Sequence, residues 1–590
     1  MRNRTLPILT ALAFCGAVFA SLAVLQAPAS AQDPDRKTTS NRDLSAVIDT
    51  EISKVWQRDS ITPVAASGDE EFIRRVYFDT VGMPPTSAEV RAFLADKDNA
   101  KRAKLIDRLL ADKRFGMFLA DHWTNILVGR SGRDFGGTNH LFAVWFSERI
   151  NAGAPFSEII RDVITAEGQI SANPAVAPYV RSIPARTADI AGNLTRNLTG
   201  VQIQCAECHD HPYEEKWTEQ TFVGVASFYA PVAVQLNIRV VPVDPGVASN
   251  ARPVRAAGNM DNLPAEARAR LEEQRKYNKP VTLDGKPLLT PDRSLWRPAL
   301  AKWTVSSENR QTARYIANRF WSFAFGMGIL NPVDDFNSFN EASHPELLEL
   351  LATDLIENNY DVRRLYRAIL NSRTYQLSGK GRPAKAELWH FAAAPVRQLN
   401  AEQFFAAFLT VSGGNDMERG YRARVPSPGD ALKRATERRM KQAEGENQRD
   451  ITYSQESLDR FIAWYEKLDD GWFLRRNMAQ AYARLSSDDE MNEAEGFTLT
   501  IDQALAVMNS DLTAALTGSG RGSVLQTVLR EHKDDPARLD ELFLRTLSRF
   551  PAGSERSVML RHVKESNGSE AAWEDVLWAL LAGTEFATNH

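Results

Sequence analysis

Residues 190–209 have the sequence IAGNLTRNLTGVQIQCAECH, which contains both a helical spacing of apolar residues and a cysteine–histidine motif. Ile190, Leu194 and Leu198 recur every four residues, which is the spacing of one face of an α-helix. The stretch then ends in two cysteines three positions apart, followed at once by a histidine. It therefore predicts a helix that packs against a core and leads directly into a site.

The helical pattern continues along most of the chain. Apolar residues recur at spacings of three and four over 103–110, and a further helix is expected to begin near Thr218. Strand signals are sparse, but apolar residues alternate strictly over 232–240, which predicts a strand or the arm of a hairpin. We expect a mainly α fold, a multi-helix architecture in two parts with a few short β-strands.

Two helix starts have the pattern of a capping box, in which a hydroxyl group and a glutamate satisfy free backbone amides. One pairs Thr86 with Glu89, and the other pairs Ser343 with Glu346. His344 would then lie in the first turn of the second helix, and we expect it to face solvent.

The motif Cys205-Ala206-Glu207-Cys208-His209 has the C-x-x-C-H spacing of c-type haem attachment. Each thiol would form a thioether bond with the porphyrin, and the His209 imidazole would be an axial ligand of the iron. The chain has three cysteines, and the third, Cys15, lies in an apolar leader. We expect one covalent haem c, and a connector, 205–217, whose compactness comes from that cofactor.

Two other interpretations of this cluster stay open. A zinc or copper ion would bind Cys205, Cys208, His209 and His211, but zinc sites usually separate their ligand pairs by about a dozen residues. Alternatively, the two cysteines form a structural or redox-active disulfide, which oxidising surroundings would favour.

The residues after the motif are candidates for supporting roles. The Asp210 carboxylate is expected either to accept the second imidazole proton of His209 or to be an ordinary exposed loop residue. For His211 we expect a hydrogen-bonded structural role with Asp210 and Pro212 rather than ligation of the iron from the opposite face.

The sixth iron ligand is sought among side chains that precede the motif. His122 and His140 are the first candidates, ahead of Met83 and Met117, and a core histidine is the alternative for His122. An open sixth position would favour ligand or oxygen chemistry, whereas a closed one would favour electron transfer.

The N-terminus has the pattern of an export signal. Two arginines precede an uncharged apolar stretch, 6–26, and Ala29-Ser30-Ala31 forms a small-x-small cleavage site. We expect a signal peptide over 1–31 and an exported protein, periplasmic or in the cell envelope, with a retained membrane anchor as the alternative. No later segment approaches the roughly 20 apolar residues of a spanning helix, so no integral membrane span is expected after cleavage.

The composition limits the remaining classes of function. The 590 residues carry a net charge of −4, and nothing in the charge pattern indicates nucleic-acid binding. No hydrolase nucleophile motif, phosphate loop or H-E-x-x-H zinc motif is found, and Asp334-Asp335 is expected to be a solvated turn. The twelve tryptophans are expected mainly to fill the core. Whether the protein is an enzyme stays open.

Several stretches resemble two bacterial domains of unknown function that occur together, the planctomycete cytochrome-like domain and its C-terminal companion. The resemblance to the first is carried by 76–86, His122-Trp123, 202–212 and Trp217. The resemblance to the companion is carried by 317–321, 331–336, 343–348, 374–376, 544–549 and 577–581. These families are associated with electron transfer and with polysaccharide breakdown, so the resemblance implies an architecture and not a reaction.

The resemblance and the composition together divide the mature chain. We expect the cytochrome-like domain over 43–230, a linker with a β-hairpin over 231–289, and the helical companion over 290–586, with a flexible charged insertion near 416–450. The function expected is that of an exported c-type haem protein that transfers electrons with a redox partner protein in an envelope pathway. A polysaccharide-related substrate is implied by the family association alone.

Overall fold

The computed structural model describes residues 43–129, 138–181, 186–235, 239–242, 276–411, 517–518 and 523–590. The expected signal peptide and the expected charged insertion near 416–450 lie outside these residues, as does most of the expected linker. Within the described ranges the fold is mainly α, as the periodicity predicted, and no helix there is long and apolar enough to cross a membrane.

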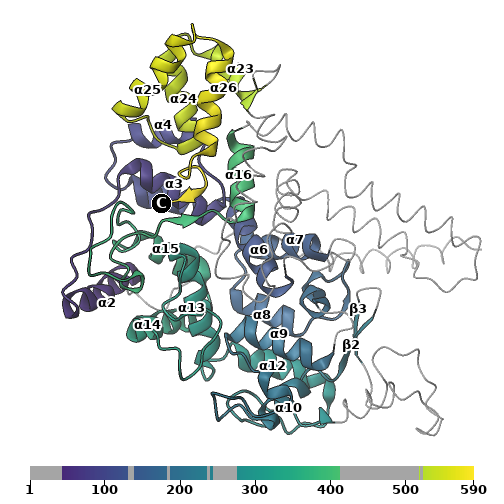
Figure 1. Ribbon diagram of the computed structural model, residues 1–590. Coiled ribbons are helices and arrows are strands. Elements are labelled where there is room, and N and C mark those ends of the chain that lie inside the picture. Colours follow the sequence, from purple (N-terminus) through teal and green to yellow (C-terminus); the bar gives the residue numbers. More distant parts are fainter. Residues whose placement is uncertain are drawn as a thin grey trace, which may run out of the picture.

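The first part of the chain forms a group of helices that contains the cysteine motif and ends one helix after it (Figure 1). Its helices are α2 (Leu44–Arg58), α3 (Asp69–Val81), α4 (Ser87–Ala95), α5 (Lys101–Ala111), α6 (Lys113–Leu127), α7 (Thr138–Asn151), α8 (Phe156–Ile164), η1 (Pro174–Val180), α9 (Thr187–Thr199), η2 (Gln204–Glu207) and α10 (Glu219–Ser227).

The second part adds helices on two sides of the first. Its helices are η4 (Arg293–Leu295), α12 (Trp296–Thr304), α13 (Arg310–Phe325), α14 (Pro345–Glu357), α15 (Val362–Asn371), η5 (Leu388–His390), α16 (Ala401–Val411), α23 (Val524–Glu531), α24 (Asp535–Leu547), α25 (Gly553–Glu565) and α26 (Glu570–Ala582). Figure 1 places the yellow C-terminal helices above α3 and α4, and the teal helices α12 to α15 lower in the molecule.

The strands are short. A three-stranded antiparallel sheet has the order β1 (Gly168–Gln169), β3 (Arg239–Pro242), β2 (Val232–Gln235). Val234 of β2 lies opposite Val240 of β3, and both side chains are buried, so a β-hairpin is present here. The alternation over 232–240 predicts a single strand or one arm of a hairpin, whereas the structure divides it between the two strands. A second pair joins β4 (Arg397–Gln398) to β5 (Thr588–Asn589) near the end of the chain.

The two predicted capping boxes have opposite outcomes. Thr86 and Glu89 form the expected box at the start of α4. The prediction at Ser343 is wrong, because its hydroxyl donates to the Ile329 carbonyl, 2.9 Å away, and α14 begins at Pro345 without a side-chain cap. A partner 14 residues earlier competes successfully with the local helix amides.

The prediction that His344 faces solvent is also wrong. Its side chain is only 2 % exposed, and its ring packs 5.5 Å from that of Phe391. Burial, together with the nearby positive charge of Arg58, lowers the pKa of His344 to about 4. Its Nε2 atom is buried without a hydrogen-bond partner, so the ring is held neutral by an apolar setting.

The two parts pack into a shared core instead of forming separate bodies. Trp123 on α6 lies 4.8 Å from Phe156 on α8, whose ring lies 6.1 Å from that of Phe320 on α13. One large apolar cluster contains all three side chains. A smaller cluster beneath the C-terminal helices contains Phe78 of α3 beside Trp573 of α26, so the first part also supports the end of the chain.

A buried carboxylate fastens the same two parts together. The Asp79 side chain is fully buried and accepts hydrogen bonds from Arg397 (2.6 Å), Asn589 (2.7 Å) and the Tyr375 hydroxyl (2.8 Å). We call these four residues the Asp79 cluster. It joins α3 to residues that lie about 300 to 510 positions later in the sequence.

Candidate functional site

The cysteine motif follows a helix end that only glycine fits. α9 ends at Gly200, whose φ is +69°, and a Cβ atom there would lie 2.6 Å from the Tyr315 ring and 2.8 Å from the Phe336 ring. The Gly200 carbonyl instead accepts the Phe336 amide at 2.8 Å. The chain therefore leaves α9 in a fixed direction, against the second part of the protein.

Both cysteines of the motif face solvent. Cys205 and Cys208 are exposed free thiols on and beside the short helix η2, whereas Ala206 between them is fully buried. Glu207 is tied back to the start of α9 by an ion pair with Arg186 at 2.8 Å. The buried Ala206 and the ion-paired Glu207 thus anchor the turn, and the two cysteines face outward.

His209 is exposed, and the position of its protons is fixed by one contact. Its Nδ1 atom lies 2.8 Å from the main-chain oxygen of Asp210. Because a carbonyl oxygen can only accept, Nδ1 must carry the proton, which leaves the Nε2 lone pair of the neutral ring unprotonated. This tautomer is the one that binds a metal through Nε2 with the other ring nitrogen held by the protein.

Asp210 and His211 hold the chain after the motif. The Asp210 carboxylate accepts the amide of Glu219, at 2.9 Å, at the first turn of α10, so its contact with His209 is made by the main chain and not by the side chain. The His211 amide donates to the Trp217 carbonyl, and its ring packs edge-on against the Trp217 ring at 5.4 Å. α10 begins after Thr218, as predicted.

The connector 205–217 packs on residues of the chain itself. Trp217 is 3 % exposed, and Glu214 is 7 % exposed with its Oε2 atom accepting the Ser338 amide at 3.0 Å. Burial opposes the charge on Glu214, but the Ser338 contact and Lys216 outweigh it, and its pKa is lower than the ordinary value. The connector therefore packs in part on the chain's own residues, and a contribution of the cofactor to its compactness stays a prediction.

A loop of the second part, 331–340, braces the connector. Besides the Gly200 and Glu214 contacts, its Asp334 accepts from Arg196 of α9 at 3.0 Å and lies 3.4 Å from Arg319 of α13. Asp334 is 5 % exposed, so the prediction of a solvated turn is wrong for this residue. Two arginines from distant helices compensate the negative charge of the buried Asp334 carboxylate. The adjacent pair Asp334-Asp335 gives no sign of this in the sequence.

The candidate sixth ligands occupy positions in the helical core. The His122 ring on α6 lies 4.7 Å from Phe118 and is stacked 4.5 Å from Phe323. His140 on α7 is 2 % exposed, and Met83 and Met117 pack against the large apolar cluster. The core position was the alternative considered for His122.

The described residues contain no group of three or more His, Cys, Asp or Glu side chains arranged to hold a metal ion. Cys205, Cys208, His209 and His211 therefore do not converge as the ligands of a tetrahedral zinc or copper site. The two thiols are not joined in a disulfide either.

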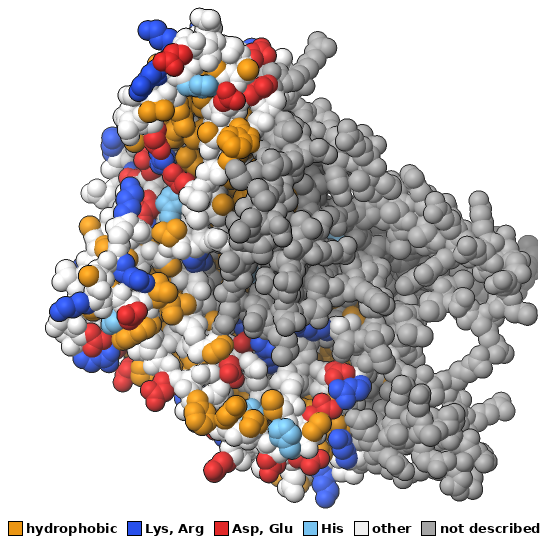
Figure 2. Space-filling view, in the orientation of Figure 1, with side chains coloured by type: hydrophobic (Ala, Val, Ile, Leu, Met, Phe, Trp, Pro, Cys, Tyr) orange, Lys and Arg blue, Asp and Glu red, His pale blue; other side chains and the backbone are white. Residues whose placement is uncertain are grey.

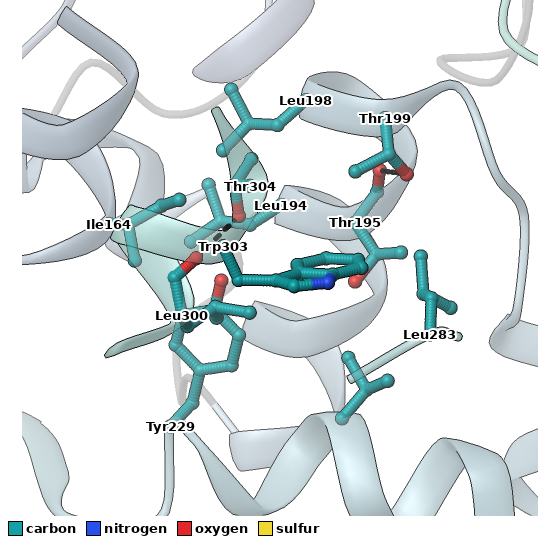
Figure 3. A pocket seen from close by; sticks show the side chains of 11 residues that line it. Ile164, Leu194, Thr195, Leu198, Thr199, Tyr229, Leu283, Leu300, Trp303 and Thr304 are labelled. Carbon is teal, nitrogen blue, oxygen red and sulfur yellow. Dashed lines mark hydrogen bonds between the residues drawn. The ribbon is translucent and has the colours of Figure 1, made fainter. Parts of the chain in front are cut away.

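A small cavity lies between α9, α10 and α12 (Figure 3). It is lined mainly by apolar side chains such as Leu194, Leu198 and Leu300, and the Trp303 indole lies across it. Its volume of about 20 Å³ suits roughly one water molecule, and no residue of the motif lines it.

Comparison with known families agrees with this two-part arrangement. The model of PSCyt2, a protein of unknown function (DUF1549), matches residues 47–234, and that of PSD1, a protein of unknown function (DUF1553), matches residues 296–563. The chain carries a PSCyt2 domain followed by a PSD1 domain. No curated protein and no solved structure matches it.

The motif lies in the PSCyt2 domain, whereas the loop that braces it lies in the PSD1 domain. Sequence reasoning missed Glu214, Ser338 and the exposed Phe339 that follows, because no local pattern marks residues whose partners are 124 positions away. The contact between the two domains is therefore part of the site.

Proposed function

We propose that this protein is an exported c-type haem protein that transfers electrons with a partner protein outside the cytoplasm. The observation that supports this best is the joint exposure of Cys205, Cys208 and His209 on one anchored turn, with the His209 Nδ1 proton held by a backbone carbonyl. A bound haem would supply one-electron chemistry at its iron.

Each residue of the turn has a distinct task in this proposal. Cys205 and Cys208 form the two thioether bonds, and His209 offers its Nε2 lone pair to the iron. The Asp210 main-chain oxygen keeps the imidazole in the required tautomer, while its carboxylate fixes the turn to the first turn of α10. None of these tasks requires a change in the core.

The export signal supports the same function. Thioether-linked haem is made outside the bacterial cytoplasm, and the sequence pattern over 1–31 predicts delivery there. The proposed location is the periplasm or the cell envelope. The mature protein would then begin at Gln32, which N-terminal sequencing of the exported chain tests directly.

The test is covalent haem staining of the full chain, produced with its leader in a bacterium that matures c-type cytochromes. We expect staining after denaturing electrophoresis and a pyridine haemochrome spectrum of one haem per chain. The double variant Cys205→Ala and Cys208→Ala should lose both signals. Glu215→Ala, an exposed change in the same connector, should keep them.

Colourless exported protein with the mass of the bare polypeptide would contradict the proposal. In that case metal analysis would separate a zinc or copper protein from a protein that uses the two cysteines as a disulfide.

A further inference from the structure

Two exposed aromatic side chains stand in contact beside the motif. Tyr213 is 68 % exposed and Phe339 is 67 % exposed, and their rings meet edge to face with centroids 5.8 Å apart. Large aromatic side chains are seldom left so open to water on a folded protein. Figure 2 shows orange side chains gathered beside pale-blue histidines at the lower end of the described surface.

The backbone that carries each ring is held by hydrogen bonds. The Tyr213 amide donates to Nδ1 of His211, at 3.3 Å. The Phe339 amide donates to Oδ1 of Asn337, at 2.8 Å, and the neighbouring Ser338 amide is bound by the buried Glu214. The backbone on each side is therefore fixed so that the two rings project outward together.

Tyr213 lies four residues after His209, so the two Cα atoms are separated by at most about 14 Å. The aromatic pair is thus within reach of a porphyrin attached to the turn. An exposed haem on an otherwise polar connector needs an apolar surface to lie against, because each porphyrin face is apolar. The connector also carries the charged side chains of Asp210 and Glu215 at its exposed surface, and these offer no apolar contact.

We propose that Tyr213 and Phe339 form an aromatic wall against which the attached haem packs, so that the PSD1 domain completes the haem site of the PSCyt2 domain. This inference rests on the proposed function. Phe339 is a positioning residue here: it does not ligate the iron but shields one side of the porphyrin from water. The edge-to-face contact with Tyr213 stabilises the position of the Phe339 ring.

The test compares Phe339→Ser with Trp578→Ser in the exported, haem-loaded protein. Trp578 is a matched control because it is also an exposed aromatic residue, 42 % exposed, and it lies on α26 of the C-terminal helices, outside the connector and the loop 331–340. The readouts are haem staining per chain, the midpoint potential of the haem and its rate of bleaching by hydrogen peroxide.

Phe339→Ser should leave haem staining unchanged, lower the midpoint potential because water favours the more charged ferric state, and raise the bleaching rate about threefold or more, as expected for the loss of one aromatic contact. Phe339→Tyr should restore both values, and Trp578→Ser should match the wild type. Equal potentials and bleaching rates in Phe339→Ser and wild type would overturn the inference.

Two further outcomes separate the possible failures. If the wild-type chain itself does not stain, the proposed function fails and not merely the aromatic wall. If Phe339→Ser slows electron exchange with a redox partner while potential and bleaching stay unchanged, the pair is a docking surface for that protein, and packing against haem is excluded.

Discussion

The Asp79 cluster and the connector 205–217 both join the PSCyt2 domain to the PSD1 domain, but they use polar groups in opposite ways. Asp79 is fully buried, and three donors from the second half of the chain surround its carboxylate. In the connector only Glu214 has a buried carboxylate that accepts a hydrogen bond from the second half of the chain, while both thiols and His209 face outward. Buried polar contacts such as those of Asp79 and Glu214 therefore hold the two domains together. The thiols and the imidazole of the motif lie on the outer surface of this domain contact.

The largest expected effect breaks the buried half of this comparison. Asp79→Ala removes the carboxylate from the Arg397 guanidinium and from two further donors, and we expect a loss of about 3 kcal/mol or more in the free energy of unfolding. Denaturant unfolding followed by circular dichroism measures it. Asp107→Ala, which breaks an exposed ion pair with Arg367, is the control and should cost less than about 1 kcal/mol.

If Asp79→Ala were as stable as Asp107→Ala, the Asp79 cluster would not stabilise the contact between the two domains. The buried carboxylate would then differ little in its effect from the exposed groups of the connector.

The next effect concerns pH, through the buried imidazole of His344. Its pKa is about 4 in the folded protein against 6.5 ordinarily, so between these values the unfolded chain binds the additional proton. The stability it contributes is complete above about pH 6.5 and is lost as the pH falls towards 4, by at most about 3 kcal/mol. His344→Asn should show a flatter decline of stability over that range.

The measurement is the unfolding midpoint of both proteins at several pH values from 7 to 4. Arg58, Asp59 and His390 face His344 and are unchanged in the variant, so the difference between the two curves isolates its own titration. Parallel curves would show that His344 is protonated without cost.

A smaller expected effect tests whether the folded connector is stable without haem. Glu214→Ala leaves the Ser338 amide without its acceptor and should cost about 1 to 3 kcal/mol. Because the connector packs on its own residues, we expect the same cost in the wild-type background and in the Cys205→Ala, Cys208→Ala background. If Glu214→Ala lowered the free energy of unfolding only when haem is attached, the cofactor and not the connector's own packing would form the local core.

The smallest expected effect belongs to the thiols. Since both cysteines are exposed and contribute nothing to the core, the double alanine variant should change the free energy of unfolding of the haem-free protein by no more than about 0.5 kcal/mol. It should nevertheless abolish covalent haem. A large loss of stability would place the two cysteines among the structural residues, beside Asp79.

Much of the local structure was predictable because its causes are local. The stripe of Ile190, Leu194 and Leu198 lies in α9, and Thr86 caps α4 through a glutamate three residues away. The apolar alternation over 232–240 marks the β2–β3 hairpin, although it was predicted as a single arm. In each case the interacting groups are close in sequence, so their spacing alone specifies the geometry.

The errors have one cause as well. Ser343, His344 and Asp334 looked like cap or surface residues, yet each meets a partner that no local pattern announces: the Ile329 carbonyl, the Phe391 ring and the Arg196 guanidinium. Arg196 and Asp334 lie 138 positions apart, and the sequence carries no signal of their contact. Tertiary contacts thus override local preferences wherever a buried polar group needs a partner.

The sequence by itself determined the helical class, the two families and the three side chains with which the chain would hold a haem. The tertiary structure alone decided that these side chains face outward, that His209 is oriented by a main-chain oxygen, and that Phe339 of the other domain contacts Tyr213 of the connector. The physical reason is range: periodicity and spacing record interactions over a few residues, whereas burial and polar partners are fixed only when distant segments pack together.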